Sequence, residues 1–159
     1  MNYFELFGMQ VTIKVDKSML ARKYLELQKK YHPDFFAQGT EAEQAEALEM
    51  SSQLNSALKT LRNEEATIKY VLQLKGLLEE EEKYPLPPEF LMEMMELNEE
   101  LSEGSGEQIN ALEKSLYAEV APIIENYDDA HVSIPELMKL KEYYYKKKYL
   151  RRILDRMVD

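Results

Sequence analysis

The sequence predicts an all-helical protein built from two small domains. Of its 159 residues, 45% are apolar and 31% charged, and only five are glycine and six proline, which is typical of a globular helical chain. Apolar residues recur at spacings of three and four, and the sequence contains no alternating strand pattern or internal repeat. Four glutamates and three prolines crowd residues 79–88. We therefore expect domains at residues 1–75 and 89–159, joined by a solvated linker at residues 76–88.

A basic helix is predicted over residues 16–31, with Asp16 as its N-cap. Its apolar side chains recur every three or four residues and form one stripe, which consists of Leu20, Tyr24, Leu27 and Tyr31. Away from the stripe the helix is basic apart from Glu26, and its cations are Arg22, Lys23, Lys29 and Lys30. A locally positive surface in an acidic protein suits an acidic partner.

The basic helix is interrupted by the triplet His32-Pro33-Asp34. Because proline disfavours helical backbone at the residue before it and has no amide to continue a helix, we expect an exposed bend here, with His32 and Asp34 facing solvent. Thr40, with Glu43 three residues later, is the expected N-cap of a second long helix. The apolar positions of that helix are Ala45, Leu48, Leu54, Leu58 and Leu61.

The second half of the chain carries three helical patterns, after a short return helix that ends at Gly76. They cover residues 89–103, 106–127 and 134–158. Because none of these helices can bury its apolar stripe alone, we expect an antiparallel three-helix bundle.

The first helix of the bundle has two apolar faces. At about 100° per residue, the core stripe consists of Phe90, Met94, Leu97 and Leu101. A second group falls on roughly the opposite side, and its members are Leu91, Met92, Met95, Glu96, Glu99 and Glu103. Unpaired carboxylates are rarely buried, and methionines beside charge are typical of surfaces that bind protein partners. We therefore predict a docking face; the alternative is a helix that buries both faces between two layers.

The net charge of −10 is unevenly distributed. Residues 1–75 are neutral overall, residues 76–136 carry −15, and residues 137–159 carry +5. The basic last helix interleaves its cations with tyrosines, a pattern that also suits nucleic acids, and these cations are Lys146, Lys147, Lys148, Arg151, Arg152 and Arg156. We expect the acidic neighbouring helices to pair with them instead, so no nucleic-acid binding is predicted.

The sequence predicts neither catalysis nor a cofactor. His32 and Asp34 sit on a tight exposed loop, without a glycine-rich phosphate cradle or a cysteine nucleophile nearby. With no cysteine and two histidines, the chain is poorly equipped for a metal centre of its own. No run approaches the roughly twenty apolar residues that span a bilayer, and residues 1–5 lack the features of a signal peptide. We expect a cytoplasmic protein that has no contact with membranes.

Together, these features of the first half resemble a J-domain. The resemblance rests on residues 3–8 (Tyr-Phe-Glu-Leu-Phe-Gly), the basic helix, residues 31–34 and the long helix that follows. J-domains stimulate ATP hydrolysis by chaperones of the seventy-kilodalton heat-shock class. The resemblance implies that an HscA- or DnaK-type chaperone is bound through the antiparallel hairpin and its loop, by His32, Pro33, Asp34, Arg22, Lys23, Lys29 and Lys30.

The second half is similar to the second domain of the HscB family, J-type co-chaperones of iron-sulfur cluster assembly. The likeness is sharpest over residues 90–101 and covers nearly the whole chain. It implies that an IscU-type scaffold protein is bound by Leu91, Met92, Met95, Glu96, Glu99, Glu103 and an aromatic residue of the last helix. We assign that aromatic residue to Tyr144; Tyr143 and Tyr145 fit the alignment as well, and core packing is the alternative for Tyr144.

The resulting hypothesis is a non-enzymatic adaptor that stimulates the chaperone and delivers the scaffold to it. A J-domain adaptor for a different client protein is the alternative. Leu25 and Glu26, in the middle of the basic helix, fit the iron-sulfur branch of J-proteins better than the general-purpose branch. The chain begins directly at the J-domain, without the cysteine zinc module of many eukaryotic members, so we expect a bacterial source.

Overall fold

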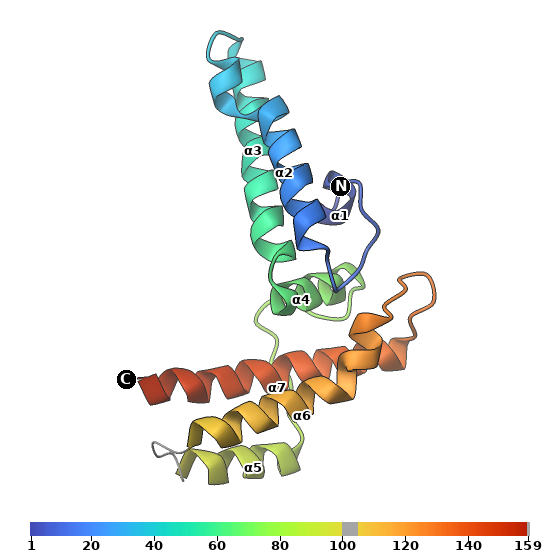
Figure 1. The fold of residues 1–159 in the computed structure, drawn as a ribbon, viewed down its shortest axis with the longest axis vertical. Helices are drawn as coiled ribbons and strands as arrows, with labels where there is room; N and C mark the ends of the chain where they lie inside the picture. Colours follow the sequence, from blue (N-terminus) through green and yellow to red (C-terminus); the bar gives the residue numbers. More distant parts are fainter. Residues whose placement is uncertain (100–104, 159) are drawn as a thin grey trace. The chain divides into compact units, whose positions relative to one another are not determined.

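The computed structural model describes residues 1–99 and 105–158, and every regular element within these ranges is a helix (Figure 1). The predicted all-α fold class is confirmed. The chain forms two compact units, Met1–Val71 and Leu72–Asp159. In the part of the chain that the structure describes, no helix is both long enough and apolar enough to cross a membrane.

The first unit is built on two long antiparallel helices, α2 (Lys17–Tyr31) and α3 (Glu41–Leu61), which lie side by side (Figure 1). The carboxylate of Asp16 accepts a hydrogen bond from a first-turn amide of α2, at 3.1 Å. The hydroxyl of Thr40 does the same for α3, also at 3.1 Å. Both predicted N-caps are therefore confirmed, and each supplies about 1 kcal/mol to its helix.

Helix α1 (Tyr3–Leu6) and the larger part of α4 (Glu64–Leu74), up to Val71, complete the first unit. Helix α1 packs against α3, and the Tyr3 ring stacks on Tyr70 of α4 at 4.6 Å between centroids. The buried apolar side chains of this unit are Phe4, Phe7, Ile13, Leu20, Ala47, Leu54, Ala57, Leu61, Ile68 and Val71. Leu48, which the sequence placed on the apolar stripe of α3, is exposed, and its neighbour Ala47 faces the core instead.

Polar side chains clamp α2 to α3 along the hairpin. The amide nitrogen of Gln28 donates to the side-chain oxygen of Asn55 at 3.1 Å, and its amide oxygen accepts from the hydroxyl of Ser51 at 3.0 Å. Ser51 is buried, so this bond also satisfies a hydroxyl that would otherwise be costly to bury. The clamp joins the last turn of α2 to the middle of α3.

The second unit is a three-helix bundle made of α5 (Pro88–Glu99), α6 (Ser105–Glu125) and α7 (Ile134–Val158), in which successive helices run antiparallel (Figure 1). This architecture was predicted. Its buried apolar side chains are Leu72, Leu78, Phe90, Met94, Ile109, Leu116, Val120, Ile124, Leu137, Leu140, Tyr143, Tyr144, Leu150 and Ile153. A reciprocal cap begins α7, since Ser133 and Glu136 each accept a hydrogen bond from the other's backbone amide, at 3.2 and 3.0 Å.

Residues 82–86, here called the strap, lie against α7. The Glu82 carboxylate accepts hydrogen bonds from Lys141 at 3.1 Å and from the Tyr145 hydroxyl at 2.7 Å. The ring of Tyr84 stacks on Tyr145 with 4.7 Å between centroids and a 6° angle between planes. The interpretation of residues 76–88 as a solvated linker is therefore wrong for Glu82, although Glu79 and other glutamates of the run are exposed. The strap belongs to the second unit.

Candidate functional site

The triplet His32-Pro33-Asp34 forms the bend between α2 and α3. Helix α2 ends at Tyr31, and His32 takes extended backbone, with φ −61° and ψ 134°, as the proline after it favours. Pro33 then begins a single turn of 3-10 helix, η1 (Pro33–Phe36), which packs against α3. The predicted bend is confirmed, and it is held in place by local chemistry and by its contact with α3.

The bend turns polar and aromatic groups outward. Side chains of His32 and Asp34 are 46% and 88% exposed. The Nδ1 atom of His32 accepts a hydrogen bond from the backbone amide of Asp34 at 3.2 Å and lies 3.6 Å from its carboxylate. The exposed ring of Phe35 meets the imidazole edge-on at 6.3 Å. Phe35 belongs to the exposed surface of the loop, and the triplet motif alone does not point to it.

The four cations predicted for chaperone binding divide into two groups. Arg22, Lys29 and Lys30 are exposed on α2. Lys23 instead reaches across to the end of α1, where its ammonium donates to the carbonyl oxygen of Phe7 at 2.9 Å. Lys23 therefore anchors α1 to α2, whereas the other three cations are available to a partner.

The outward face of α5 carries the predicted apolar and acidic side chains. Met92 and Met95 are 64% and 59% exposed. Leu91 is half-buried, and Glu96 and Glu99 are exposed. Of the core stripe, Phe90 and Met94 are buried and Leu97 is half-buried, so the alternative of a helix buried on both faces is wrong. Two positions that the sequence assigned to this helix, Leu101 and Glu103, lie outside the described residues.

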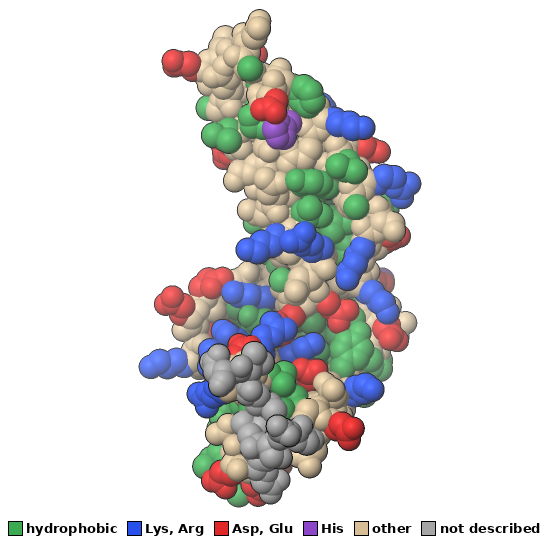
Figure 2. Space-filling view, turned by 60° about the vertical axis from the view of Figure 1, so that its left-hand side comes forward, with side chains coloured by type: hydrophobic (Ala, Val, Ile, Leu, Met, Phe, Trp, Pro, Cys, Tyr) green, Lys and Arg blue, Asp and Glu red, His purple; other side chains and the backbone are tan. Residues whose placement is uncertain are grey.

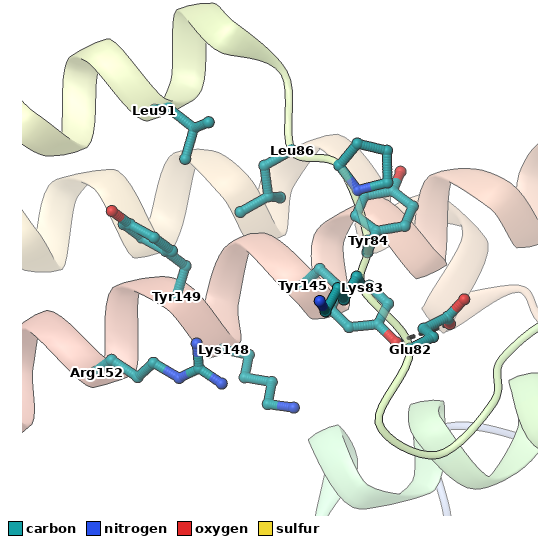
Figure 3. A pocket seen from close by; sticks show the side chains of 10 residues that line it. Glu82, Lys83, Tyr84, Leu86, Leu91, Tyr145, Lys148, Tyr149 and Arg152 are labelled. Atoms are coloured by element: carbon teal, nitrogen blue, oxygen red, sulfur yellow. Dashed lines mark hydrogen bonds between the residues drawn. The ribbon is translucent and has the colours of Figure 1, made fainter.

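A groove of about 580 Å³ lies beside α5, bounded by the strap and by α7 (Figure 3). Its main lining residues are Leu86, Leu91, Tyr145, Lys148, Tyr149 and Arg152. In Figure 3, Tyr149 points toward Leu91, and its ring also meets that of Phe90 edge-on at 6.1 Å. Tyr149 is the aromatic residue of α7 that packs against α5, and it was not among the three tyrosines predicted from the sequence.

Tyr144, the aromatic residue chosen from the sequence, is buried, at 8% exposed, and packs edge-on against Tyr145. The core-packing alternative therefore describes its position. Tyr143 is buried as well, while Tyr145 reaches the groove with its hydroxyl bonded to Glu82. The three consecutive tyrosines point in different directions around α7, and a tyrosine one turn further along the helix faces α5.

The contact between Glu82 and Tyr145 shifts the pKa values of the two groups in opposite directions. Burial alone would raise the pKa of the Glu82 carboxyl, but the hydrogen bonds from Tyr145 and Lys141 leave that pKa below its ordinary value. Burial and the adjacent Glu82 carboxylate raise the pKa of Tyr145 well above its ordinary value. At neutral pH the Glu82 carboxylate is therefore ionised and accepts a hydrogen bond from the protonated phenol of Tyr145, which ties the strap to α7.

Charged and apolar groups are mixed on this unit. On the face drawn in Figure 2, Lys and Arg side chains gather close to hydrophobic ones in the lower part of the picture. Within residues 1–99 and 105–158, no three histidine, aspartate or glutamate side chains come together as metal ligands.

Comparison with known proteins gives consistent matches. Residues 86–157 match the family model described as the HSCB C-terminal oligomerisation domain. A Vibrio cholerae protein named co-chaperone protein HscB homolog is 42% identical over 102 residues, which are 64% of this chain and 60% of that protein. The homologue from Photobacterium profundum is 32% identical over 154 residues, which are 89% of this chain and 90% of the homologue.

Solved structures of HscB proteins are also similar to this chain. The crystal structure of human co-chaperone protein HscB superposes with a TM-score of 0.80 at 28% identity, covering 99% of this chain and 80% of the human one. Chaperone HscB from Vibrio cholerae gives a TM-score of 0.66 at 29% identity, with 99% of both chains covered.

Proposed function

Because this chain belongs to the HscB co-chaperone family, we propose that it is a J-type co-chaperone of iron-sulfur cluster assembly. Its first unit binds an HscA- or DnaK-type chaperone and stimulates ATP hydrolysis there. Its second unit binds an IscU-type scaffold protein and delivers it to the chaperone. One observation carries the proposal: a single chain presents an exposed His32-Pro33-Asp34 bend and an exposed methionine face on α5.

The chaperone contact is built on the bend. Asp34, almost fully exposed, supplies a carboxylate to an arginine of the chaperone, and such charge-assisted hydrogen bonds are about twice as strong as neutral ones. His32 adds a hydrogen-bonding and packing contact, and Pro33 holds the bend rigid. The exposed cations Arg22, Lys29 and Lys30 accelerate docking onto an acidic surface, so stimulation weakens as salt rises.

The client contact is built on α5. Met92 and Met95 supply exposed apolar surface, and their unbranched side chains can repack around a partner. Glu96 and Glu99 lie beside them and give the contact a preferred orientation. Leu91 and Tyr149 extend the apolar surface into the groove. We include Tyr149 in place of Tyr144, because Tyr144 is buried.

The adaptor works by tethering the client to the chaperone and hydrolyses nothing itself. A chain that holds the client and the chaperone together raises the client's effective concentration at the chaperone, with gains of about 10²- to 10⁴-fold in such tethered systems. Contact of the bend with the chaperone favours its hydrolysing state, which holds the client tightly. The two binding surfaces therefore have to lie on one chain.

The test is the steady-state ATPase rate of an HscA- or DnaK-type chaperone with this protein and an IscU-type scaffold added. We expect the wild type to stimulate hydrolysis and the scaffold to raise the rate further. Asp34→Asn and His32→Gln should abolish stimulation while leaving the helical circular dichroism signal and scaffold affinity unchanged. The matched control is Glu49→Gln, which removes an exposed carboxylate from the middle of α3 and should stimulate normally.

Three outcomes would contradict parts of the proposal. Normal stimulation by Asp34→Asn would exclude the bend as the chaperone contact. Stimulation that requires His32 but does not respond to the scaffold would indicate a J-domain adaptor for a different client. A wild type that stimulates none of the chaperones would exclude the co-chaperone function altogether.

A further inference from the structure

The α7 side of the groove carries two cations that the proposed contacts do not use. Lys148 and Arg152 lie one helical turn apart on α7, and both are exposed. Figure 3 shows their side chains extending along the edge of the groove, on the α7 side away from Leu91. Neither cation forms an ion pair with any residue that the structure describes, whereas Lys141 and Lys146 of the same helix pair with carboxylates at 3.1 Å each.

The other side of the docking surface has the opposite charge. Helix α5 presents Glu96 and Glu99 on its outward face, beside the exposed methionines. Between the two charged margins lies an apolar strip that includes Leu91 and Tyr149. The surface therefore has an acidic margin on α5, an apolar centre and a basic margin on α7.

We propose that Lys148 and Arg152, here called the cationic rim, bind carboxylates of the client protein. The occupant is an amphipathic client segment with apolar side chains in the groove, carboxylates toward α7 and cations toward α5. The identity of the client rests on the function proposed above, and the rim adds the charge pattern that the client must carry. Because two opposed margins can be satisfied together in only one orientation, the rim also determines the direction in which the segment lies.

The neighbouring aromatic rings favour a protein segment over a nucleic acid. Single-stranded nucleic acids bind by stacking bases on open aromatic faces. Here the ring of Tyr145 is stacked against Tyr84, and the ammonium of Lys148 lies over the Tyr145 ring at 5.9 Å from its centroid. The sugar–phosphate backbone of a nucleic acid would also meet the carboxylates of α5 on a protein of net charge −10. Discrete carboxylates next to apolar side chains match the surface better.

The experiment compares two variants with the same change in charge. Lys148→Glu with Arg152→Glu reverses the cationic rim, and Lys114→Glu with Lys139→Glu reverses two exposed cations that do not line the groove. Isothermal titration calorimetry measures the affinity of each full-length chain for an IscU-type scaffold at low and moderate salt. We expect the rim variant to bind about tenfold more weakly or worse, with a smaller salt dependence than the wild type. The control should stay within about threefold of the wild type.

A milder pair, Lys148→Gln with Arg152→Gln, should lose affinity in the same direction by a smaller factor, and it serves if the reversal impairs folding. Unchanged affinity in the rim variants, with a wild type that binds the scaffold, would overturn the rim and leave the proposed function intact. A wild type that stimulates the chaperone but binds no scaffold would overturn the client assignment and the rim together. Wild-type binding to a polyuridylate 20-mer that is lost in the rim variants, while scaffold affinity is kept, would assign the rim to nucleic acid instead.

Discussion

At the scale of single residues, two side chains have structural roles that their sequence neighbourhoods conceal. Lys23 belongs to a basic helix whose sequence predicts one docking surface. Its ammonium instead donates a hydrogen bond to the carbonyl oxygen of Phe7 and so stabilises its own unit. Glu82 belongs to a run of glutamates that is predicted to be solvated, yet its carboxylate accepts hydrogen bonds that tie the strap to α7. A charged residue in a charged run can therefore be structural, and only its contacts in space distinguish it.

The strap contact predicts how stability depends on pH. The folded-state pKa of Glu82 lies below its ordinary value of 4.5, so its bonds to Tyr145 and Lys141 stabilise the fold above about pH 4.5 and are lost as the pH falls through the folded pKa. Glu82→Gln should lower the free energy of unfolding at pH 7 by on the order of 1–2 kcal/mol. The difference from the wild type should shrink below pH 4.5, as urea denaturation followed by circular dichroism can measure.

Glu79→Gln is the control for this prediction, because Glu79 lies in the same run with its side chain exposed. It should leave stability unchanged at both pH values. A Glu82→Gln deficit of equal size at pH 7 and pH 3.5 would mean that the effect does not depend on ionisation of the carboxylate.

At the scale of elements, we expect the two faces of α5 to have different roles, one in stability and the other in scaffold binding. Met94 is buried and Met95 is largely exposed, one residue along the helix. Met94→Ala should cost about 2–5 kcal/mol of stability, because it leaves a cavity in the bundle. Leu91→Ala with Met95→Ala should weaken scaffold binding by a few kcal/mol, with much less effect on the melting temperature. Thermal denaturation and calorimetric titration of the same preparations check both statements.

Equal losses of stability in the Met94 variant and the Leu91, Met95 variant would show that both faces of α5 are core. Loss of scaffold affinity in Met94→Ala alone would place the contact elsewhere on the unit.

Local features of the elements could be predicted from the sequence, and their packing partners could not. Asp16 and Thr40 cap the helices that they were expected to cap, because a cap depends on residues within one turn. The two faces of α5 also follow from helical periodicity alone. Tyr149 was missed because its contact with Phe90 depends on how α7 is rotated against α5, which no spacing within one helix specifies. Leu48 was placed on the wrong face for a similar reason, since α3 buries the smaller Ala47 against its neighbours.

At the scale of the whole molecule, the family likeness inferred from short motifs is confirmed by relatives that align over most of the chain. The proposed mechanism needs both binding surfaces on one chain, and this need can be tested by mixing defective chains. Asp34→Asn should retain the client surface, and Leu91→Ala with Met95→Ala should retain the chaperone surface. An equimolar mixture should show the chaperone's response to the J-domain without the further increase from the scaffold, because the tether is absent.

The measurement is the ATPase rate of the chaperone with the mixture and with each variant alone, at the same total concentration and with the scaffold present. A mixture that recovers the full wild-type rate would show that the scaffold and the J-domain act independently, and that the chain does not deliver one to the other.

The hydrogen bond from the Asp34 amide to the Nδ1 atom of His32 determines which hydrogen-bonding group the imidazole offers to a partner. In the neutral form of the imidazole, an acceptor at Nδ1 places the proton on Nε2, so the second ring nitrogen of the half-exposed side chain is an N–H donor. In the proposed complex we expect the chaperone group at this ring edge to be an acceptor, such as a carbonyl or carboxylate oxygen, and the group at Asp34 to be a donor. Because the bend carries a donor on His32 and an acceptor on Asp34, a partner with the complementary pair of groups can bind it in only one orientation.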